Sequence, residues 1–339
     1  MKKFINDPFK VTDELVEGFV LANQEYYYKL DDMNVVLRKR LEDEKKVALV
    51  IGGGSGHEPL FLEFIGKGMG DCAVHGNIFA SPSADIIYEG IKEADQGEGV
   101  ILIYGNYQGD IINFDMAQEM ARMDDIRVET VRIWDDIASA GPENKEERRG
   151  TSGDIFVIKI AGAAKELGWS FDEVLRVALK ARDSCRSLGI ALSSCTLPAV
   201  GKPIFEIADD EMCIGMGVHG EPGLRWEKLM TADDTAKMIL DEIQKDDLNL
   251  QSGDEISLIV NSYGATTRME LLIMIRRFYQ LFEELGIKIH AVEYGDLCTS
   301  QEMAGVSVTI MKLDEELRML YDEDAVSPGF TRVTQKERS

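Results

Sequence analysis

Short apolar runs that end in glycine constrain the fold of this chain more than any other sequence feature. The first run, at 47–51, leads directly into Gly-Gly-Gly-Ser-Gly-His-Glu-Pro at 52–59. A short apolar run closed by glycine is typical of a strand buried on both faces of a parallel sheet. Two similar runs alternate with two helical stretches: runs at 100–104 and 128–133, and helices at 84–94 and 114–123. This alternation indicates an α/β domain with a mainly parallel sheet.

The length of 339 residues allows about two domains of ordinary size. Helical patterns are expected at 12–44, 155–167, 171–186, 232–245 and 267–285, and a polar loop at 141–153. Strands are expected at 190–197, 212–218, 255–260 and 288–293, with 305–312 as the hairpin partner of the last. The pattern changes near 187. We therefore predict two α/β domains, 1–186 and 187–339, each with a mainly parallel or mixed sheet flanked by helices.

The composition argues against whole classes of partner. Acidic residues number 61 against 37 basic ones, a formal charge of −24, whereas nucleic acid and anionic membranes require a basic surface. No apolar run approaches the ~18 residues of a membrane span, and the first residues do not resemble a signal peptide. Five scattered cysteines lack C-x-x-C spacing. They indicate reduced thiols in a cytoplasmic protein, with no metal site.

The glycine-rich segment at 52–59 carries the first histidine of interest, His57. Consecutive glycines bring backbone N–H groups close to a small polar ligand, although for the glycine run by itself a plain tight turn is the favoured interpretation. The segment matches neither the Walker loop nor the dinucleotide fingerprint. His57 follows a predicted strand, where ligands of α/β sheets usually bind; the alternative is a histidine that caps a helix.

Asp110 ends the sequence Asn-Tyr-Gln-Gly-Asp at 106–110, again after a predicted strand. Its spacing fits the N-cap of a helix that begins at 111. A carboxylate at the same sheet edge as His57 also fits a general base, and the two roles are compatible.

His219 lies in Gly-Met-Gly-Val-His-Gly-Glu-Pro-Gly at 215–223. Glycines on both sides leave its ring unshielded, which favours a nucleophile or an acid/base over a structural histidine.

Four other positions give weaker signals. The Ser81 hydroxyl is a candidate ligand contact or part of a proline turn, and His75 is a candidate for the same pocket. His290 alternates with apolar residues and is interpreted as structural. Asp135 and Asp136 fit either a solvated turn or a metal-binding acid pair, and we favour the turn.

Together these segments resemble the substrate-binding K subunits of dihydroxyacetone kinases. The similarity rests on the segments at 52–59, 106–110 and 215–223, and on shorter matches at 79–82, 97–99, 148–150, 189–192, 198–203, 251–254 and 264–266. It therefore covers essentially the whole chain.

The resemblance implies a role for each matching residue. His219 would bond through its ring nitrogen to the carbonyl carbon of a short ketose, giving a hemiaminal. Asp110 would take the proton of the hydroxyl to be phosphorylated, and His57 would act as acid/base at the substrate oxygens. The remaining oxygens would be held by Gly53, Gly54 and Ser81.

The resemblance also implies partners. The family's nucleotide, Mg-ADP or Mg-ATP, belongs to an L subunit or a fused second domain. The chain ends at Ser339 without such a domain, so we expect a stand-alone K subunit of the phosphoenolpyruvate-dependent system, without a cofactor of its own and with an L subunit as partner. K subunits of the family are homodimers.

Several positions depart from the family. Gly105 replaces a usual lysine, Ala80 a common threonine, and His75 a residue that is not usually histidine; 134–137 is also atypical. These departures make a four-carbon ketose such as erythrulose a competitor of dihydroxyacetone. A further alternative is a catalytically silent paralogue that binds ketose and acts as coactivator of a transcription regulator, and another is an enzyme for a different carbonyl substrate.

Overall fold

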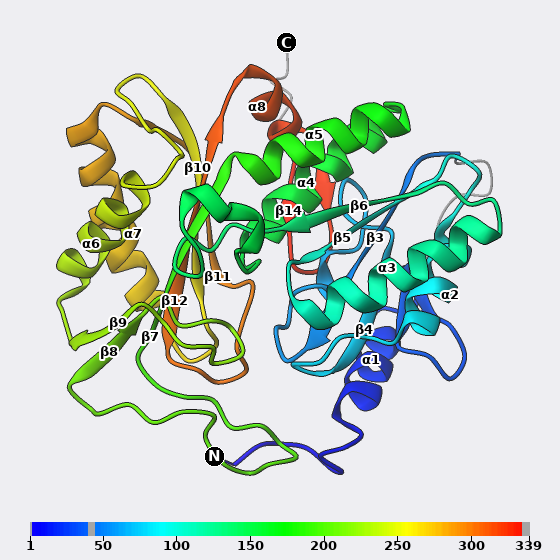
Figure 1. Cartoon of the computed structure of the whole chain (residues 1–339), viewed down its shortest axis with the longest axis horizontal. Helices are drawn as coiled ribbons and strands as arrows, with labels where there is room; N and C mark the ends of the chain where they lie inside the picture. The colour runs from blue at the N-terminus through cyan, green and yellow to red at the C-terminus, as the bar shows by residue number, and fades with distance from the viewer. Residues whose placement is uncertain (1, 40–44, 334–339) are drawn as a thin grey trace.

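The computed structural model describes residues 2–39 and 45–333. Two six-stranded sheets stand side by side, with α4 (Gly153–Glu166) and α5 (Phe171–Asp183) between them (Figure 1). The predicted fold class, two α/β units each with a sheet flanked by helices, is confirmed. No helix in these two ranges is long and apolar enough to cross a membrane.

The first sheet is mixed, with strand order β1-β2-β4-β3-β5-β6. Its central strands β4, β3, β5 and β6 are parallel, whereas β1 and β2 form an antiparallel edge. Its strands are β1 (Tyr27–Lys29), β2 (Val35–Arg38), β3 (Ala48–Ser55), β4 (Cys72–Ile78), β5 (Val100–Gly105) and β6 (Val128–Ile133). Helices α2 (Ala84–Ala94) and α3 (Gln108–Met123) cover one face, and α1 (Val11–Ala22) and α4 the other.

The second sheet has the order β11-β10-β12-β7-β8-β9, and only β10 and β11 are parallel. Its strands are β7 (Cys185–Ala191), β8 (Glu211–Ile214), β9 (Arg225–Lys228), β10 (Glu255–Ser262), β11 (Lys288–Asp296) and β12 (Gly305–Leu313). Its outer face is covered by α6 (Ala232–Gln244) and α7 (Arg268–Leu285). The remaining elements are α8 (Glu315–Asp322), β13 (Ala325–Val326), β14 (Thr331–Arg332), and the 3-10 turns Leu62–Phe64 and Pro142–Glu147.

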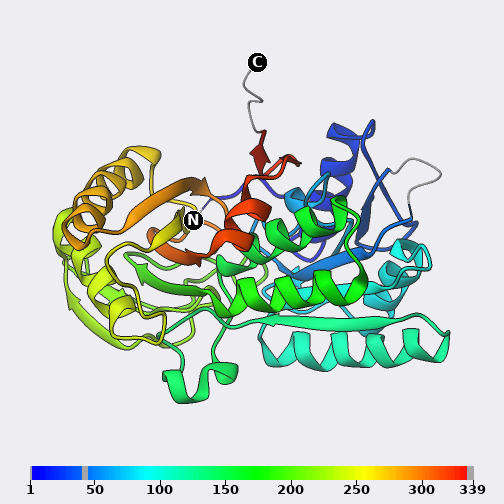
Figure 2. The same cartoon turned by 90° about the horizontal axis from the view of Figure 1, so that it is seen from above.

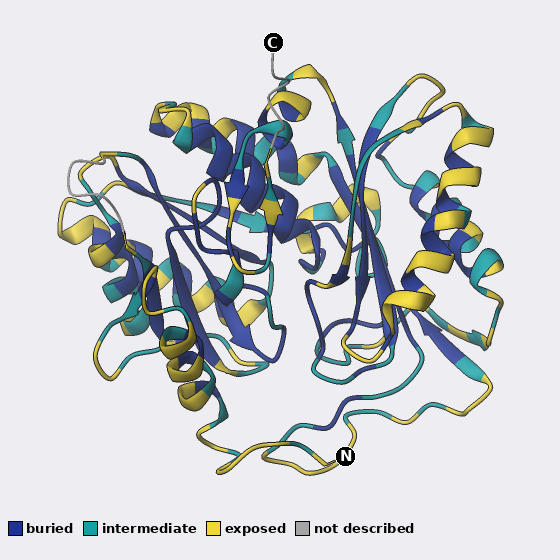
Figure 3. Ribbon diagram, turned by 180° about the vertical axis from the view of Figure 1, so that it is seen from behind, coloured by how far each residue is buried: buried dark blue, intermediate teal, exposed yellow. Residues whose placement is uncertain are grey.

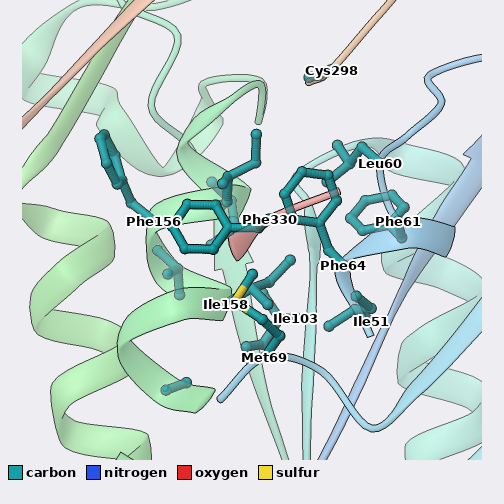
Figure 4. Packing of buried hydrophobic residues seen from close by; sticks show 14 of the residues in the cluster. Ile51, Leu60, Phe61, Phe64, Met69, Ile103, Phe156, Ile158, Cys298 and Phe330 are labelled. Carbon is teal, nitrogen blue, oxygen red and sulfur yellow. The ribbon is translucent and has the colours of Figure 1, made fainter. Parts of the chain in front are cut away.

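Helix α4 joins the two sheets into one core. Every residue from Gly153 to Lys165 is buried, and the helix runs between the two halves in Figure 2. Exposed residues lie on the outer helices, whereas the sheets and α4 are buried (Figure 3). Phe156 of α4 packs near Phe330, Leu60 and Phe64 (Figure 4). The two-domain boundary near 187 stays a prediction; β7 begins two residues before it, at Cys185.

Several predicted elements were wrong in type or extent. The helix predicted at 12–44 ends at Ala22, because the chain then forms the β1–β2 hairpin. This hairpin contains tyrosines and valines, which favour strands, and turns at Asp32 in the left-handed region (φ 58°). The helix predicted at 171–186 ends at Asp183. The strand predicted at 190–197 corresponds to β7, which begins five residues earlier than predicted, at Cys185.

The predicted hairpin between 288–293 and 305–312 was also wrong. β11 and β12 lie on opposite sides of β10. The connecting segment crosses the end of β10 because Asn261 holds it: its Oδ1 accepts the backbone N–H groups of Leu297 and Cys298, and its Nδ2 donates to the Cys298 carbonyl at 2.7 Å. A buried side chain of β10 thus anchors the segment that connects β11 to β12.

Candidate active site

Loops from both sheets meet at one pocket. His57 follows β3, Asp110 follows β5, and His219 lies after β8. The carboxyl ends of parallel strands are the usual ligand sites of α/β sheets. The pocket is small, with an empty volume of about 350 Å³ that includes space open to solvent. It is lined by Gly52, Gly53, Gly54, His57, Leu60, Phe61, Gly105, Tyr107, Asp110, Gly150, Thr151, Asp154, Val218, His219 and Cys298.

A larger depression beside α8 has an empty volume of about 1980 Å³ but a mostly charged, open lining. His290 lies there and not in the smaller pocket; its Nδ1 is 3.2 Å from Glu255 and its Nε2 is 2.8 Å from Asp322. His290 thus links β11 to its neighbours. The smaller pocket is the better candidate because His57 and His219 meet in it.

His57 and His219 contact each other directly. Their Nε2 atoms are 2.9 Å apart, and Nδ1 of His57 is 2.7 Å from the carbonyl oxygen of Thr299. Burial, and then the neighbouring His219, lower the pKa of His57 to about 3, so its ring is neutral near pH 7. Because a carbonyl oxygen only accepts, the single proton of His57 lies on Nδ1 and its Nε2 presents a lone pair to His219.

Glu221 holds His219 from the other side. Its Oε1 is 2.8 Å from Nδ1 of His219, and its Oε2 accepts the backbone N–H of His219 at 3.0 Å. Burial raises the pKa of Glu221, but the hydrogen bond from His219 and its charge outweigh burial and lower it to about 2. Glu221 is ionised and Nε2 of His57 accepts. When His219 carries both ring protons, its Nδ1 therefore donates to Glu221 and its Nε2 donates to His57.

The glycines of the His219 loop make this clamp possible. A Cβ on Gly217 would lie 2.1 Å from Oε2 of Glu221, so a side chain there would displace the carboxylate. Gly215 and Gly220 have φ of 81° and 82°, in the left-handed region that favours glycine. The loop and His219 were predicted from the sequence but Glu221 was not; its place two residues after an unshielded histidine was the available signal.

Aromatic rings fix the two histidines. Phe79 stacks on His57 with ring centres 4.9 Å apart, and Tyr107 meets His219 edge-on at 4.7 Å. The Tyr107 hydroxyl donates to the Gly150 carbonyl at 2.9 Å. Neither ring was predicted as part of the site, because an aromatic residue beside a polar loop is usually an ordinary core residue.

Asp110 lies inside the first turn of α3, and the N-cap is Tyr107. The N-cap interpretation of Asp110 was therefore wrong. Its carboxyl is buried, its Oδ1 has no hydrogen-bond partner, and it lines the pocket. Burial raises the pKa of Asp110 to about 6, although the Ser81 hydroxyl and His219 lower it. A carboxyl with this pKa is suited to act as a base near neutral pH.

The other predicted ligand contacts lie at different depths. Gly53 and Gly54 line the pocket, but as part of β3 and not of a loop. Ser81 lies against Asp110 without being part of the lining. His75 is paired in register with Gly53 from β4 and is fully buried, with no partner for either ring nitrogen. The structure thus brings Gly53, Gly54 and the His57–His219 pair together, and places His75 behind them.

Asp135 and Asp136 do not form a solvated turn. Both are buried. Asp135 accepts the backbone N–H groups of Thr151 and Gly153 at 2.8 and 2.9 Å, and so caps α4. Asp136 pairs with Arg149 at 2.7 Å. Among the described residues no cluster of three or more histidine, cysteine or acidic side chains is placed to bind a metal.

The chain is similar to proteins of one family along nearly its whole length. The Dak1 domain matches residues 17–329. A relative from Listeria innocua, PTS-dependent dihydroxyacetone kinase 2, dihydroxyacetone-binding subunit DhaK, is 42% identical over 331 residues, which is 97% of this chain and 99% of the relative.

Two further comparisons extend this similarity. An L-erythrulose 1-kinase from Mycolicibacterium smegmatis is 41% identical over 336 residues, which is 98% of this chain and 58% of the kinase. The solved structure of a dihydroxyacetone kinase operon co-activator, Dha-DhaQ, superposes with a TM-score of 0.86 at 30% identity, covering 94% of this chain and 97% of the co-activator.

Proposed function

The chain belongs to the Dak1 domain family of dihydroxyacetone kinase subunits, and we propose that it is the ketose-binding subunit of a phosphoenolpyruvate-dependent dihydroxyacetone kinase. The relative named for that role is similar over 99% of its own length. The observation that carries the proposal is the joining of His57, His219 and Asp110 in one small pocket. Such a pocket suits a substrate of a few carbon atoms.

In the proposed mechanism the ketose is bound covalently at His219. The proton on Nε2 of His219 passes to Nε2 of His57, 2.9 Å away. The freed lone pair attacks the carbonyl carbon, the π electrons move to the carbonyl oxygen, and the His57 imidazolium returns the proton to that oxygen. The product is a hemiaminal, with the positive charge of the substituted His219 ring facing the Glu221 carboxylate.

Covalent capture gives selectivity and orientation. A ketone or aldehyde has an electrophilic carbon and glycerol has none, so polyols do not react. The fixed carbon presents a hydroxyl to Asp110, which takes its proton while the phosphoryl group arrives.

The phosphoryl donor is proposed to lie on a partner. The lining of the pocket includes no lysine or arginine that would hold a nucleotide's phosphates, and its volume suits a small ligand. We therefore assign the nucleotide and its magnesium to an L subunit that docks over the pocket. A homodimer in the cytoplasm completes the proposal, as the family resemblance implies.

Two relatives support narrower alternatives. The L-erythrulose 1-kinase favours a four-carbon ketose as substrate, and the operon co-activator favours a ketose sensor that acts on a transcription regulator. The base-like Asp110 beside His219 favours the kinase, because a sensor needs the binding histidine but no base.

A single-turnover reaction tests the proposal. The protein is mixed with an L subunit loaded with Mg-ATP and with dihydroxyacetone or erythrulose, and sugar phosphate is measured. Product is expected, and the faster ketose identifies the substrate. Ketose that binds without forming product would contradict the kinase and favour the sensor.

A further inference from the structure

Asp154 is a second carboxyl in the pocket, and the proposed mechanism does not use it. It lies in the first turn of α4, is 2% exposed, and lines the pocket together with His57, Asp110 and Cys298. No sequence motif drew attention to this residue.

One oxygen of the Asp154 carboxyl, Oδ1, is free to bind a ligand. Eight buried side-chain nitrogen and oxygen atoms of the described residues lack a hydrogen-bond partner. Only two of these atoms belong to residues that line the pocket, Oδ1 of Asp110 and Oδ1 of Asp154. A buried polar atom without a partner is unfavourable, so a ligand that supplies one is bound more strongly.

A structural role does not account for Asp154. Aspartate in the first turn of a helix often caps its N–H groups. Here that role is taken by Asp135, which accepts the backbone N–H groups of Thr151 and Gly153. No ion pair is formed by Asp154 with any described basic residue.

The surroundings of Asp154 favour the neutral form of its carboxyl. Burial, and then the nearby charges of Asp135 and Asp110, raise its pKa well above the usual range. A neutral carboxyl both donates and accepts hydrogen bonds, and therefore suits a ligand hydroxyl better than an amine.

We propose that Asp154 binds the ketose hydroxyl that is not phosphorylated. A ketose bonded to His219 through its carbonyl carbon has a hydroxyl-bearing carbon on each side, and the pocket has two carboxyl oxygens without partners. Asp110 receives one hydroxyl as base, and Asp154 holds the other. This inference rests on the proposed function and defines the ligand class as ketones with a hydroxyl on both neighbouring carbons.

The test compares dihydroxyacetone with hydroxyacetone, which lacks the second hydroxyl. Affinities for both are measured by calorimetry on the full chain, for the wild type, Asp154→Ala and Asp154→Asn. We expect the wild type to bind dihydroxyacetone more tightly than hydroxyacetone. Asp154→Ala should reduce this ratio of affinities about tenfold, which is the change expected from the loss of one hydrogen bond. Asp154→Asn should keep most of the preference, because an amide still donates and accepts.

Asp172→Ala is the matched control, because it removes an exposed aspartate from the first turn of the neighbouring helix α5, outside the pocket. Its preference between the two ketones should equal that of the wild type. If Asp154→Ala does not fold, Asp154→Cys replaces it, since cysteine is of similar size and a weak hydrogen-bonding group.

The outcomes separate the two proposals. An unchanged preference in the Asp154→Ala or Asp154→Cys protein, with ketose still bound at His219, would overturn the role of Asp154 alone. A wild-type protein that binds neither ketone would overturn the proposed function and this inference with it.

Discussion

The Nε2 atoms of His57 and His219 lie 2.9 Å apart, although 162 positions separate the residues in the chain. One follows β3 of the first sheet, and the other lies after β8 of the second. Segment 297–304 contacts both loops: Thr299 accepts from His57 through its carbonyl and donates its backbone N–H to the His57 carbonyl at 3.1 Å, and the Ser300 hydroxyl donates to the carbonyl of Val218, next to His219, at 2.6 Å. The site therefore depends on the packing of the two sheets.

We expect His219→Ala to lose all covalent ketose. The variant removes the only group of the proposed mechanism that attacks the carbonyl carbon. Mass spectrometry after rapid desalting would measure the adduct, with His290→Ala as a control that removes a histidine outside the pocket. Wild-type retention of ketose by His219→Ala would contradict the hemiaminal.

We expect Glu221→Gln to lower the affinity for ketose about 10- to 100-fold, which is the usual contribution of a hydrogen bond to a charged group. The amide keeps the shape of the side chain but does not neutralise the positive charge of the substituted His219 ring. Calorimetry measures the loss. Glu227→Gln is the matched control, because it removes the same charge from a pair with Arg225 on β9. Equal losses in both variants would remove Glu221 from the mechanism.

Periodicity alone could predict most of the fold. The buried strands β3, β5 and β10 and the helices α2, α6 and α7 have strong patterns and lie close to their predicted positions. The β1–β2 hairpin was missed because its strands are short, of three and four residues, and follow a true helix without a clear break. The place of β12, antiparallel to β10 on the side opposite β11, is a long-range pairing that no local pattern encodes.

The site was predictable where a residue type is unusual in its setting. Histidines next to glycines were such signals, and His57 and His219 do meet. Tyr107 and Asp154 carried no signal, since an aromatic residue in a loop or an acidic residue in a first helical turn is common, and the signal of Glu221 was limited to its place two residues after His219. Only the fold shows that they share a pocket or contact its histidines.

The role predicted for His75 can be tested by selectivity. The sequence analysis expects it to influence the choice between three- and four-carbon ketoses, and the structure places it next to Gly53 on the neighbouring strand. We expect His75→Ala to change the ratio of affinities for dihydroxyacetone and erythrulose, through a shift of Gly53. An identical ratio would remove His75 from the substrate site.

His75 should also make the protein sensitive to acid. Burial lowers its pKa to about 4, whereas an exposed histidine titrates near 6.5. Between these values the unfolded chain binds a proton that the folded chain does not, so stability is full above about pH 6.5 and falls as the pH drops toward 4. Between pH 7 and 5 we expect the free energy of unfolding to fall about 2 kcal/mol more in the wild type than in His75→Leu. Urea unfolding at both pH values measures this difference, and equal falls would contradict it.

Asp110→Asn should separate capture from transfer. We expect the variant to bind ketose at His219 but to transfer the phosphoryl group about 10²-fold more slowly or worse, because an amide does not take a proton. The carboxylate is the active form and its pKa is about 6, so the wild-type transfer rate should fall as the pH drops below 6. Ser81→Ala should move this fall to higher pH, because the Ser81 hydroxyl lowers the pKa of Asp110. Single-turnover rates across pH 5–8 test all three proteins, and full transfer by Asp110→Asn would leave Asp110 without a catalytic role.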